Sequence, residues 1–369
     1  MPLQAKLFTP FGALADYQKE WTDLWERAGH PPLASWEGVL AWEEYFGKDQ
    51  PVYTVVISSE ESGQFIAAIP LQIFKKYGLL SIGRLLENPW FPAGGILFDP
   101  SYETKIVAPL VCEALAKLPV SVCQFQNFQE LTPSPLLLEM AKMNRLWNPK
   151  VEFGDPIALF DLPENQEGFE KRLSRNFRRS ITKAKNRLKK VDKVKFEIRS
   201  DFSSGDELFE LIQQCFEVEK NSWKGKEESS VIQNGLLPLY QAQGESLWQS
   251  ENFFLARLWL DEHLVAFNYG WKWNETYYSL KIGYDEEFSW FSPGKILFYF
   301  CFCEFIEKGE GKFLHPLSPE TPFLKLWKPQ QHPNPKYLFY RKNFTGSVIS
   351  MAHAGVSALK KWTSRRSET

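Results

Sequence analysis

The segment from Tyr278 to Leu317 constrains the fold most, because its pattern changes from strand to helix and back to strand. A β-rich run ends at Tyr284, a short loop carries Ser292-Pro293-Gly294, and an apolar helix is predicted over 295–308 before a second strand over 312–317. Proline suits the first turn of a helix, and glycine lets a ligand approach the backbone closely. A helix that begins in this way presents free N–H groups and the positive end of its dipole. The unit is therefore typical of a phosphate site, although strand–turn–helix segments also occur without a ligand.

The length of 369 residues predicts two domains. Two β-hairpins with acidic turns, at 53–74 and 253–273, each follow a pair of helices, which suggests two copies of one α/β fold. We therefore expect an α/β (α+β) protein with two tandem domains, each a mixed central sheet flanked by helices. The expected boundaries are 1–150 for the first domain, 151–345 for the second and 346–369 for a basic C-terminal tail.

Apolar periodicity predicts the remaining elements. The expected helices lie at 13–28, 34–46, 103–117, 135–145, 164–190, 205–222 and 234–248. The expected strands lie at 51–59, 64–74, 119–128, 157–161, 195–199, 253–260 and 264–273. The stretch 129–152 contains prolines and is a poor β-former, so we expect it to carry a helix and the domain crossover.

Composition excludes several classes of protein. The formal net charge of −2 gives no global attraction to nucleic acid or to an anionic membrane. The start of the chain does not read as a signal peptide, and no run of 18 apolar residues predicts a transmembrane helix. The five cysteines lie in apolar surroundings without the spacing of metal ligands, so we expect reduced core residues, no metal and a cytoplasmic protein.

A strongly basic helix is predicted over 164–190. From Lys171 to Lys195 there are twelve Lys or Arg residues and one acid, Asp192, while apolar residues recur at helical spacing from Leu173 to Val191. Such a helix is either a solvated face docked by its apolar stripe or a surface that binds an anion. The candidate anions are a cofactor phosphate, an acyl carrier protein, a tRNA or an anionic lipid surface.

These segments together resemble a known family. The stretches that carry the resemblance are FEKRLSRNFRRSITKAKNRL (169–188), NSWK (221–224), LDEHLVAFNYG (260–270), YDEEFSWFSPGKIL (284–297) and FLKLW (323–327). They resemble the CelD-type acetyltransferases linked to bacterial cellulose biosynthesis, which belong to the GNAT acyltransferase superfamily and share a duplicated plan with the FemABX aminoacyltransferases. The resemblance implies that the first domain is a degenerate GNAT-like copy. It also implies an acyl-CoA donor held by the loop residues Phe291, Ser292, Gly294 and Lys295.

Acyl transfer from a thioester needs a deprotonated nucleophile, a stabilised oxyanion and a proton for the departing thiolate. The thiolate leaves readily, so direct attack needs no enzyme nucleophile. Tyr284 is the candidate proton donor; alternatively, it is a tyrosine that only packs in the fold. His315 is the candidate base unless it is a core or surface histidine, and Asp285, at the same strand end as Tyr284, is a third catalytic candidate unless it caps the turn.

The acceptor side is predicted at two places. Lys325 and Trp327 are expected to line it, and Trp223 and Lys224 are expected to close over the cleft, although Trp223 also suits a core position.

The sequence thus predicts an N- or O-acyltransferase that moves an acyl group from acyl-CoA or acyl carrier protein to an amine or hydroxyl, with an acceptor from polysaccharide or envelope metabolism. An aminoacyltransferase of the FemABX type, which uses charged tRNA, is one alternative. A non-catalytic binding protein of polysaccharide export is the other.

Overall fold

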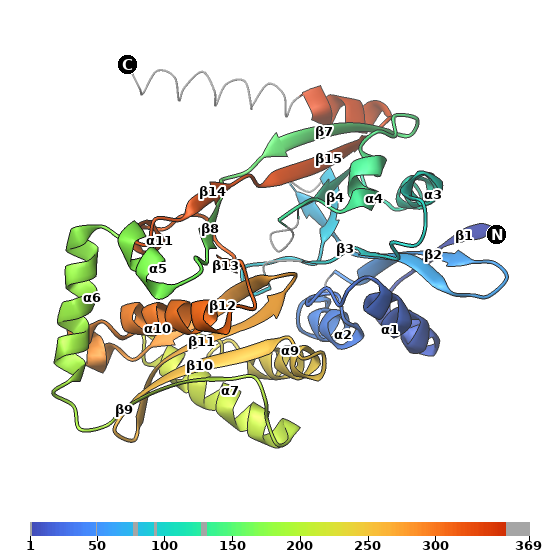
Figure 1. Ribbon diagram of the computed structural model, residues 1–369. Coiled ribbons are helices and arrows are strands. Elements are labelled where there is room, and N and C mark those ends of the chain that lie inside the picture. The colour runs from blue at the N-terminus through green and yellow to red at the C-terminus, as the bar shows by residue number, and fades with distance from the viewer. Residues whose placement is uncertain (1, 49, 77–79, 92–93, 127–130, 352–369) are drawn as a thin grey trace, which may run out of the picture. The chain divides into compact units, whose positions relative to one another are not determined.

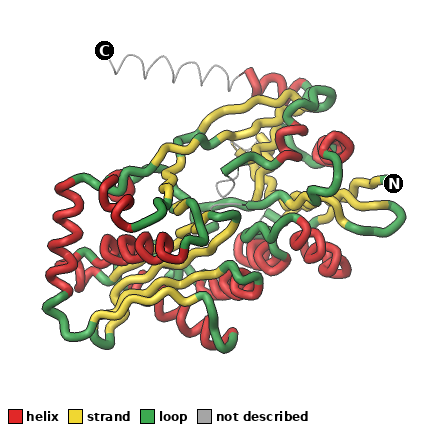
Figure 2. Tube along the Cα trace, in the orientation of Figure 1, coloured by secondary structure: helices red, strands yellow, loops and turns green. Residues whose placement is uncertain are grey.

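The computed structural model describes residues 2–48, 50–76, 80–91, 94–126 and 131–351. The chain forms two compact units, of which the first comprises Met1–Gly154 with Asn334–Thr369 and the second comprises Asp155–Pro333. Each unit has its own mixed sheet and its own helices, which Figures 1 and 2 show. The protein is therefore mixed α/β, as the sequence predicts.

The first unit is built on a sheet whose described strands have the order β1-β2-β3-β4-β6-β15-β7, with β5 paired to β3. Its strands are β1 (Leu3–Phe8), β2 (Val52–Ser59), β3 (Phe65–Lys76), β4 (Leu80–Leu85), β5 (Leu97–Phe98), β6 (Val122–Phe125), β7 (Trp147–Phe153) and β15 (Pro335–Arg341). Its helices are η1 (Phe11–Tyr17, a 3₁₀ helix), α1 (Gln18–Arg27), α2 (Trp36–Phe46), α3 (Thr104–Leu115) and α4 (Pro135–Met140).

The second unit is built on a sheet with the order β14-β8-β13-β12-β11-β10-β9. Its strands are β8 (Ile157–Asp161), β9 (Val194–Arg199), β10 (Phe253–Leu260), β11 (His263–Trp273), β12 (Thr276–Tyr284), β13 (Phe313–His315) and β14 (Gln330–His332). Its helices are α5 (Gln166–Arg172), α6 (Arg175–Leu188), α7 (Gly205–Lys220), α8 (Trp223–Lys226), α9 (Leu237–Gln249), η2 (Glu286–Phe291, a 3₁₀ helix), α10 (Pro293–Lys308) and α11 (Pro322–Lys325).

Helices cover both faces of strands β10 to β12. Phe254 packs edge-on against Phe305 of α10, whereas its neighbour Phe253 packs against Tyr269, which in turn contacts Phe216 of α7. Successive strand residues point to opposite faces, so α10 lies on one face and α7 on the other. The apolar face of α10 is buried because it packs against this sheet.

The predicted βαβ unit is confirmed, since β12 and β13 pair in parallel and α10 connects them. Both predicted hairpins are also confirmed, as β2–β3 and β10–β11. The strand expected over 119–128 is β6, and residues 127–128 lie outside the described part of the chain.

The helix predicted over 164–190 is wrong in its continuity, because it is two helices, α5 and α6. Leu173 has an extended backbone, and Ser174 then begins α6 by accepting a hydrogen bond from the Phe177 N–H at 3.2 Å. The predicted apolar stripe of α6 is buried at Phe177, Ile181, Ala184 and Leu188.

The end of the chain differs from the expected domain division. The expected second domain ran to residue 345, but β15 lies between β6 and β7 in the sheet of the first unit. The stretch 129–152, expected to lack strands, contains most of β7. Of the expected basic tail, residues 352–369 lie outside the described chain.

Candidate active site

Two neighbouring strands separate at the centre of the second unit. β13 pairs with the first three residues of β12, from Thr276 to Tyr278, and then ends at His315. β12 continues for six more residues to Tyr284. The later part of β12 therefore has an edge that β13 does not cover.

A β-bulge marks the place where the strands separate. Tyr269 of β11 pairs with Lys281, but Gly270 pairs with Ser279, so Leu280 is an extra residue in β12. The Asp285 N–H donates to the Val265 carbonyl at 2.9 Å. Because hydrogen-bonded and non-hydrogen-bonded pairs alternate along an antiparallel ladder, the backbone groups of Ile282 and Tyr284 face away from β11. They therefore lie along the uncovered edge.

Helix α10 begins beside this edge. Ser292 has a left-handed backbone (φ 61°) and Pro293 occupies the first helical position. The N–H groups of Lys295 and Ile296 donate to the Ser292 carbonyl at 3.1 and 3.2 Å. A Cβ on Gly294 would lie 3.3 Å from Cδ1 of Tyr284, so the glycine lets the tyrosine ring lie against the first turn of α10. The positive end of the helix dipole is thus next to an aromatic side chain of the strand.

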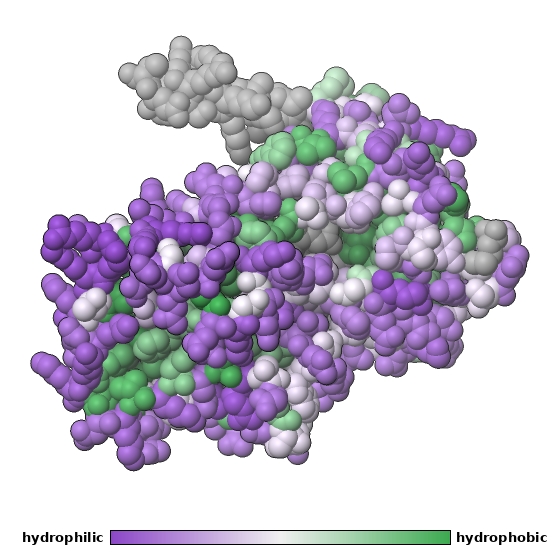
Figure 3. All heavy atoms as spheres, viewed as in Figure 1, coloured by the Kyte–Doolittle hydropathy of each residue, from purple (hydrophilic) through white to green (hydrophobic). Residues whose placement is uncertain are grey.

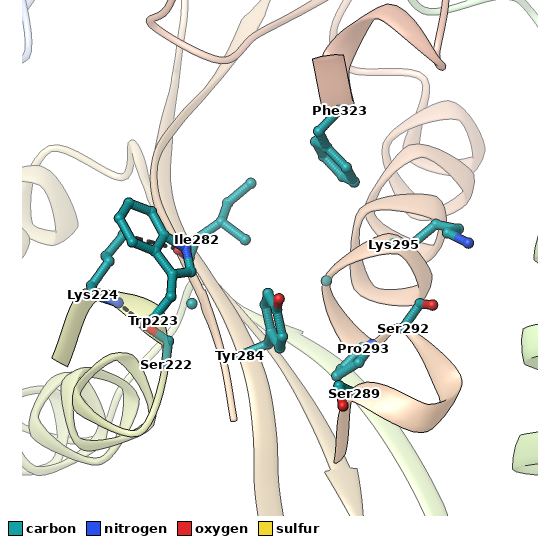
Figure 4. Close-up of a pocket in the computed structure, with 12 residues that line it drawn as sticks. Ser222, Trp223, Lys224, Ile282, Tyr284, Ser289, Ser292, Pro293, Lys295 and Phe323 are labelled. Carbon is teal, nitrogen blue, oxygen red and sulfur yellow. Dashed lines mark hydrogen bonds between the residues drawn. The ribbon is translucent and has the colours of Figure 1, made fainter. Parts of the chain in front are cut away.

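The uncovered edge and the start of α10 enclose a cavity of about 420 Å³. Figure 4 shows Tyr284 standing between a wall that carries Trp223 and Lys224 and a wall formed by α10. The lining residues are Ser222, Trp223, Lys224, Ile282, Gly283, Tyr284, Ser289, Ser292, Pro293, Gly294, Lys295 and Phe323.

Lys224 is fixed by a buried carboxylate. Its Nζ donates to Oε1 of Glu219 at 2.6 Å and to the Ile282 carbonyl at 3.2 Å. Oε2 of Glu219 accepts from the Val231 N–H at 2.9 Å, and Glu219 is fully buried. Because the Ile282 carbonyl faces the uncovered edge of β12, the ammonium of Lys224 is held at that edge.

Further cations lie close to the cavity. Burial lowers the pKa of Lys295, and the Arg187 guanidinium lowers it further. Burial also lowers the pKa of Lys281 to about 8; the Glu219 carboxylate opposes this shift and Lys224 adds to it. The surroundings of the cavity are thus electropositive.

Six predicted site residues line this one cavity. They are Tyr284, Ser292, Gly294, Lys295, Trp223 and Lys224. Trp223 is half-exposed on the rim, so the core position that the sequence also allowed is excluded.

Three other predicted residues lie elsewhere in the second unit. His315 is fully buried opposite Tyr278, and its Nδ1 accepts from the Leu317 N–H at 2.8 Å. Since Tyr278 and Tyr284 are six strand residues apart, about 20 Å, His315 as a base and Tyr284 as a proton donor do not lie at one site. Asp285 caps η2 by accepting from the Glu287 N–H at 2.9 Å, and Phe291 is a fully buried core residue.

Lys325 and Trp327, two of the four residues predicted on the acceptor side, also lie outside the cavity lining. Trp327 is buried in an aromatic cluster with Phe169, Phe298 and Phe302, and Lys325 is exposed on α11. The same short helix contributes Phe323 to the lining instead.

Glu219 and Phe323 are among the residues of the site that were missed in the sequence. Glu219 follows Leu208, Ile212 and Cys215 at spacings of 4, 3 and 4 residues, which puts an acid on the apolar stripe of α7. That mismatch is a signal for a paired buried carboxylate. Phe323 gave no comparable signal, because it lies in an irregular stretch rich in proline.

The basic surface of α6 adjoins the cavity. Nζ of Lys295 lies 3.4 Å from Oγ of Ser180, and Arg187 donates to the Trp290 carbonyl. Among the described residues no carboxylate forms an ion pair with a basic residue of α6 or of the turn after it. These residues are Arg175, Arg178, Arg179, Lys183, Lys185, Arg187, Lys189 and Lys190. Figure 3 shows the resulting hydrophilic surface at the left of the view.

Comparisons with known proteins agree with this geometry. Residues 175–314 match the model of a family described as an acetyltransferase (GNAT) domain. The match includes α6, the uncovered edge of β12 and all of α10. The second unit therefore contains a GNAT-type acetyltransferase domain. A search of curated proteins finds no match.

Solved structures share the fold over most of the chain. The C-terminal domain of a putative lysylphosphatidylglycerol synthetase from Agrobacterium fabrum is 13% identical, with a TM-score of 0.53 over 93% of this chain and 96% of that chain. FemX is 12% identical, with a TM-score of 0.53 over 88% and 96%. L-PGS from Bacillus licheniformis is 14% identical, with a TM-score of 0.51 over 92% and 95%. The plan is that of two tandem GNAT-like domains.

Within the described ranges no helix combines the length and the apolar composition that crossing a membrane requires.

Proposed function

We propose that the protein is an acyltransferase that takes an acyl group from a thioester, with acyl-CoA as the donor, and transfers it to an amine or hydroxyl. The observation that carries the proposal is the cavity in which the uncovered edge of β12 meets the start of α10. The donor pyrophosphate would lie on the first turn of α10, near Ser292, Gly294 and Lys295.

The uncovered edge of β12 suits the pantetheine arm. Its amides are extended and alternate donor and acceptor, so they would pair with the Tyr284 backbone and the Ile282 N–H as an added strand does, whereas the Ile282 carbonyl already accepts from Lys224. The thioester would lie on the same edge, where backbone N–H groups would stabilise the developing oxyanion.

The transfer would be direct. The acceptor nitrogen or oxygen attacks the carbonyl carbon, the C–S bond breaks, and the tetrahedral intermediate collapses to the acylated acceptor. The acceptor loses one proton and the departing thiolate gains one, for which Tyr284 is the proposed donor. None of the five cysteines lines the cavity, and burial raises the pKa of each thiol above its ordinary value. A cysteine nucleophile is therefore not proposed.

The acceptor would enter from the wall that carries Trp223 and Lys224. The resemblance to CelD-type acetyltransferases supports an acceptor from polysaccharide or envelope metabolism. The exposed cations of α6 support a second contact, with an acyl carrier protein as an alternative donor. The cytoplasmic location stays a prediction.

The proposal is tested by calorimetric titration of the full chain with CoA and acetyl-CoA, followed by thiol release from acetyl-CoA in the presence of amine and hydroxyl acceptors. Binding together with acceptor-dependent thiol release is the expected result. Binding without release for any acceptor would favour the non-catalytic alternative, and no binding of either compound would refute the proposal.

Aminoacyl transfer from charged tRNA is the second candidate. It is favoured by the unpaired cations of α6 and by the fold shared with FemX and the lysylphosphatidylglycerol synthetase domain. Transfer of labelled aminoacyl groups from tRNA, in a protein that does not bind CoA, would establish it in place of acyl-CoA chemistry.

A further inference from the structure

The side chain of Lys224 is fixed at the cavity by two hydrogen bonds. The ammonium has three N–H donors, and in the described structure two of them have acceptors, Glu219 and the Ile282 carbonyl. Its side chain is 21% exposed, so the anchored cation still meets the cavity. An ammonium fixed in this way can bind an anion without first losing the conformational freedom of a long side chain.

The charges around the cavity do not cancel. Two of the lining residues, Lys224 and Lys295, are cationic, and the lining contains no carboxylate. Both oxygens of Glu219 are already engaged, by Lys224 and by the Val231 N–H. Lys281 adds a further positive charge next to Glu219. All three lysines are partly buried, and an excess of partly buried positive charge is stabilised when an anion pairs with it.

The two lining lysines lie on different walls. Figure 4 shows Lys295 on α10, where the donor phosphates are proposed to bind, and Lys224 on the far side of Tyr284. The donor phosphates would therefore pair with Lys295, and Lys224 would be available to bind the acceptor.

We propose that the acceptor carries a carboxylate or phosphate group that pairs with Lys224 on the wall opposite α10. The inference rests on the proposed function, because it needs the donor to occupy the α10 side. It also fits the chemistry. Anion pairing at Lys224 would orient the acceptor, and the positive surroundings favour the neutral, nucleophilic form of an acceptor amine.

The test uses two matched pairs of amines with the CoA-saturated full chain: glycine against glycinamide, and glucosamine 6-phosphate against glucosamine. Calorimetric binding is measured for each. We expect at least one anionic member to bind ~10- to 100-fold more tightly than its neutral partner, as a charge-assisted hydrogen bond would give. The pair that shows the effect tells whether the acceptor's anion is a carboxylate or a phosphate.

Lys224→Met should abolish this preference and leave the CoA affinity unchanged. That substitution leaves the buried Glu219 carboxylate without its cation. In the double variant Lys224→Met with Glu219→Gln both charges are removed, so it tests the same wall without a buried unpaired carboxylate. Lys226→Met is the matched control, since Lys226 lies two residues further along the chain, is exposed and pairs with Glu286.

Two results would overturn the inference: neither anion binding more tightly than its neutral partner, or a preference that survives in both Lys224 variants. Either would leave the proposed function standing if CoA still binds. A wild-type protein that binds neither CoA nor acetyl-CoA would instead refute the proposed function, and this inference with it.

Discussion

Gly294→Asp should weaken the affinity for CoA without lowering the stability of the protein. The residue follows Pro293 in the first turn of α10, where a carboxylate interacts favourably with the helix dipole by about 0.3–1 kcal/mol. Gly294 is not among the residues with a positive φ, so a side chain needs no unusual backbone. The added Cβ would lie 3.3 Å from Cδ1 of Tyr284, and this half-buried ring can move by a few tenths of an ångström. We therefore expect unfolding stability to be unchanged or slightly higher.

Binding of CoA should be much weaker. A carboxylate about 5 Å from a phosphate, at an effective dielectric constant of about 20, costs about 3 kcal/mol, which corresponds to about a 100-fold loss of affinity. Gly294→Asn is the matched control, because it has nearly the same shape without the charge and should lose only the steric part.

Calorimetric titration and thermal unfolding of the three proteins measure both effects. Equal weakening by Asp and Asn would show that space, and not charge, limits binding at this position. An Asp variant that folds and binds CoA as the wild type does would refute the assignment of the pyrophosphate to α10.

Three further predictions concern single features. Tyr284→Phe should lower the turnover rate by roughly 10²-fold, with the donor affinity and the melting temperature unchanged, since the hydroxyl has no hydrogen-bond partner among the described residues; a normal rate would exclude it as the proton donor. Replacing Arg175, Arg178 and Arg179 by Glu should keep the fold, because exposed charges contribute little to stability. The replacement should abolish any salt-sensitive binding of a carrier protein or tRNA. If binding by the wild type does not depend on salt, α6 is only a solvated face. Burial raises the pKa of Glu87 to about 7 from 4.5, so between these pH values the carboxyl keeps its proton in the native state and loses it in the unfolded chain. As the pH rises from 4.5 to above 7, the wild type should therefore lose about 3 kcal/mol of stability relative to Glu87→Gln. If urea unfolding shows a constant difference between the two proteins across this range, the assignment is contradicted.

The sequence predicts local elements best where one period dominates. The hairpins and α10 have clear alternation or helical spacing and were predicted within a few residues. The break between α5 and α6 was not predicted, because the apolar stripe continues through Leu173 without proline or glycine and only the capping Ser174 marks the new start.

Long-range pairing explains the other errors. β7 contains Pro149, which argued against a strand, but β7 is the edge of its sheet and tolerates a residue without an N–H. Its partner β15 lies nearly two hundred residues further along the chain, and no local pattern indicates that pairing.

The residues of the candidate site also fall into those that local sequence patterns predict and those that depend on long-range pairing. The loop that begins α10 and the adjacent Tyr284 are neighbours in sequence, so the βαβ pattern was enough to place them. His315 and Trp327 were misplaced because residue spacing does not give the register at which β13 meets β12, or the side of α11 that is buried. Glu219 could have been found, since an acid on an apolar stripe needs a partner.

The return of β15 to the first sheet also has a consequence for the order in which the chain can fold during synthesis. The N–H of Gly154 donates to the Asn334 carbonyl at 3.0 Å, so the chain leaves the first unit and re-enters it at adjacent points, and the whole second unit is an insertion between two paired strands. At ribosomal rates of about 5–20 residues per second, β7 waits on the order of ten to forty seconds until its partner strand β15 is made. The inserted second unit has been synthesised before then. A released chain that ends at Pro333 should therefore expose an unfinished first sheet while its second unit is already folded.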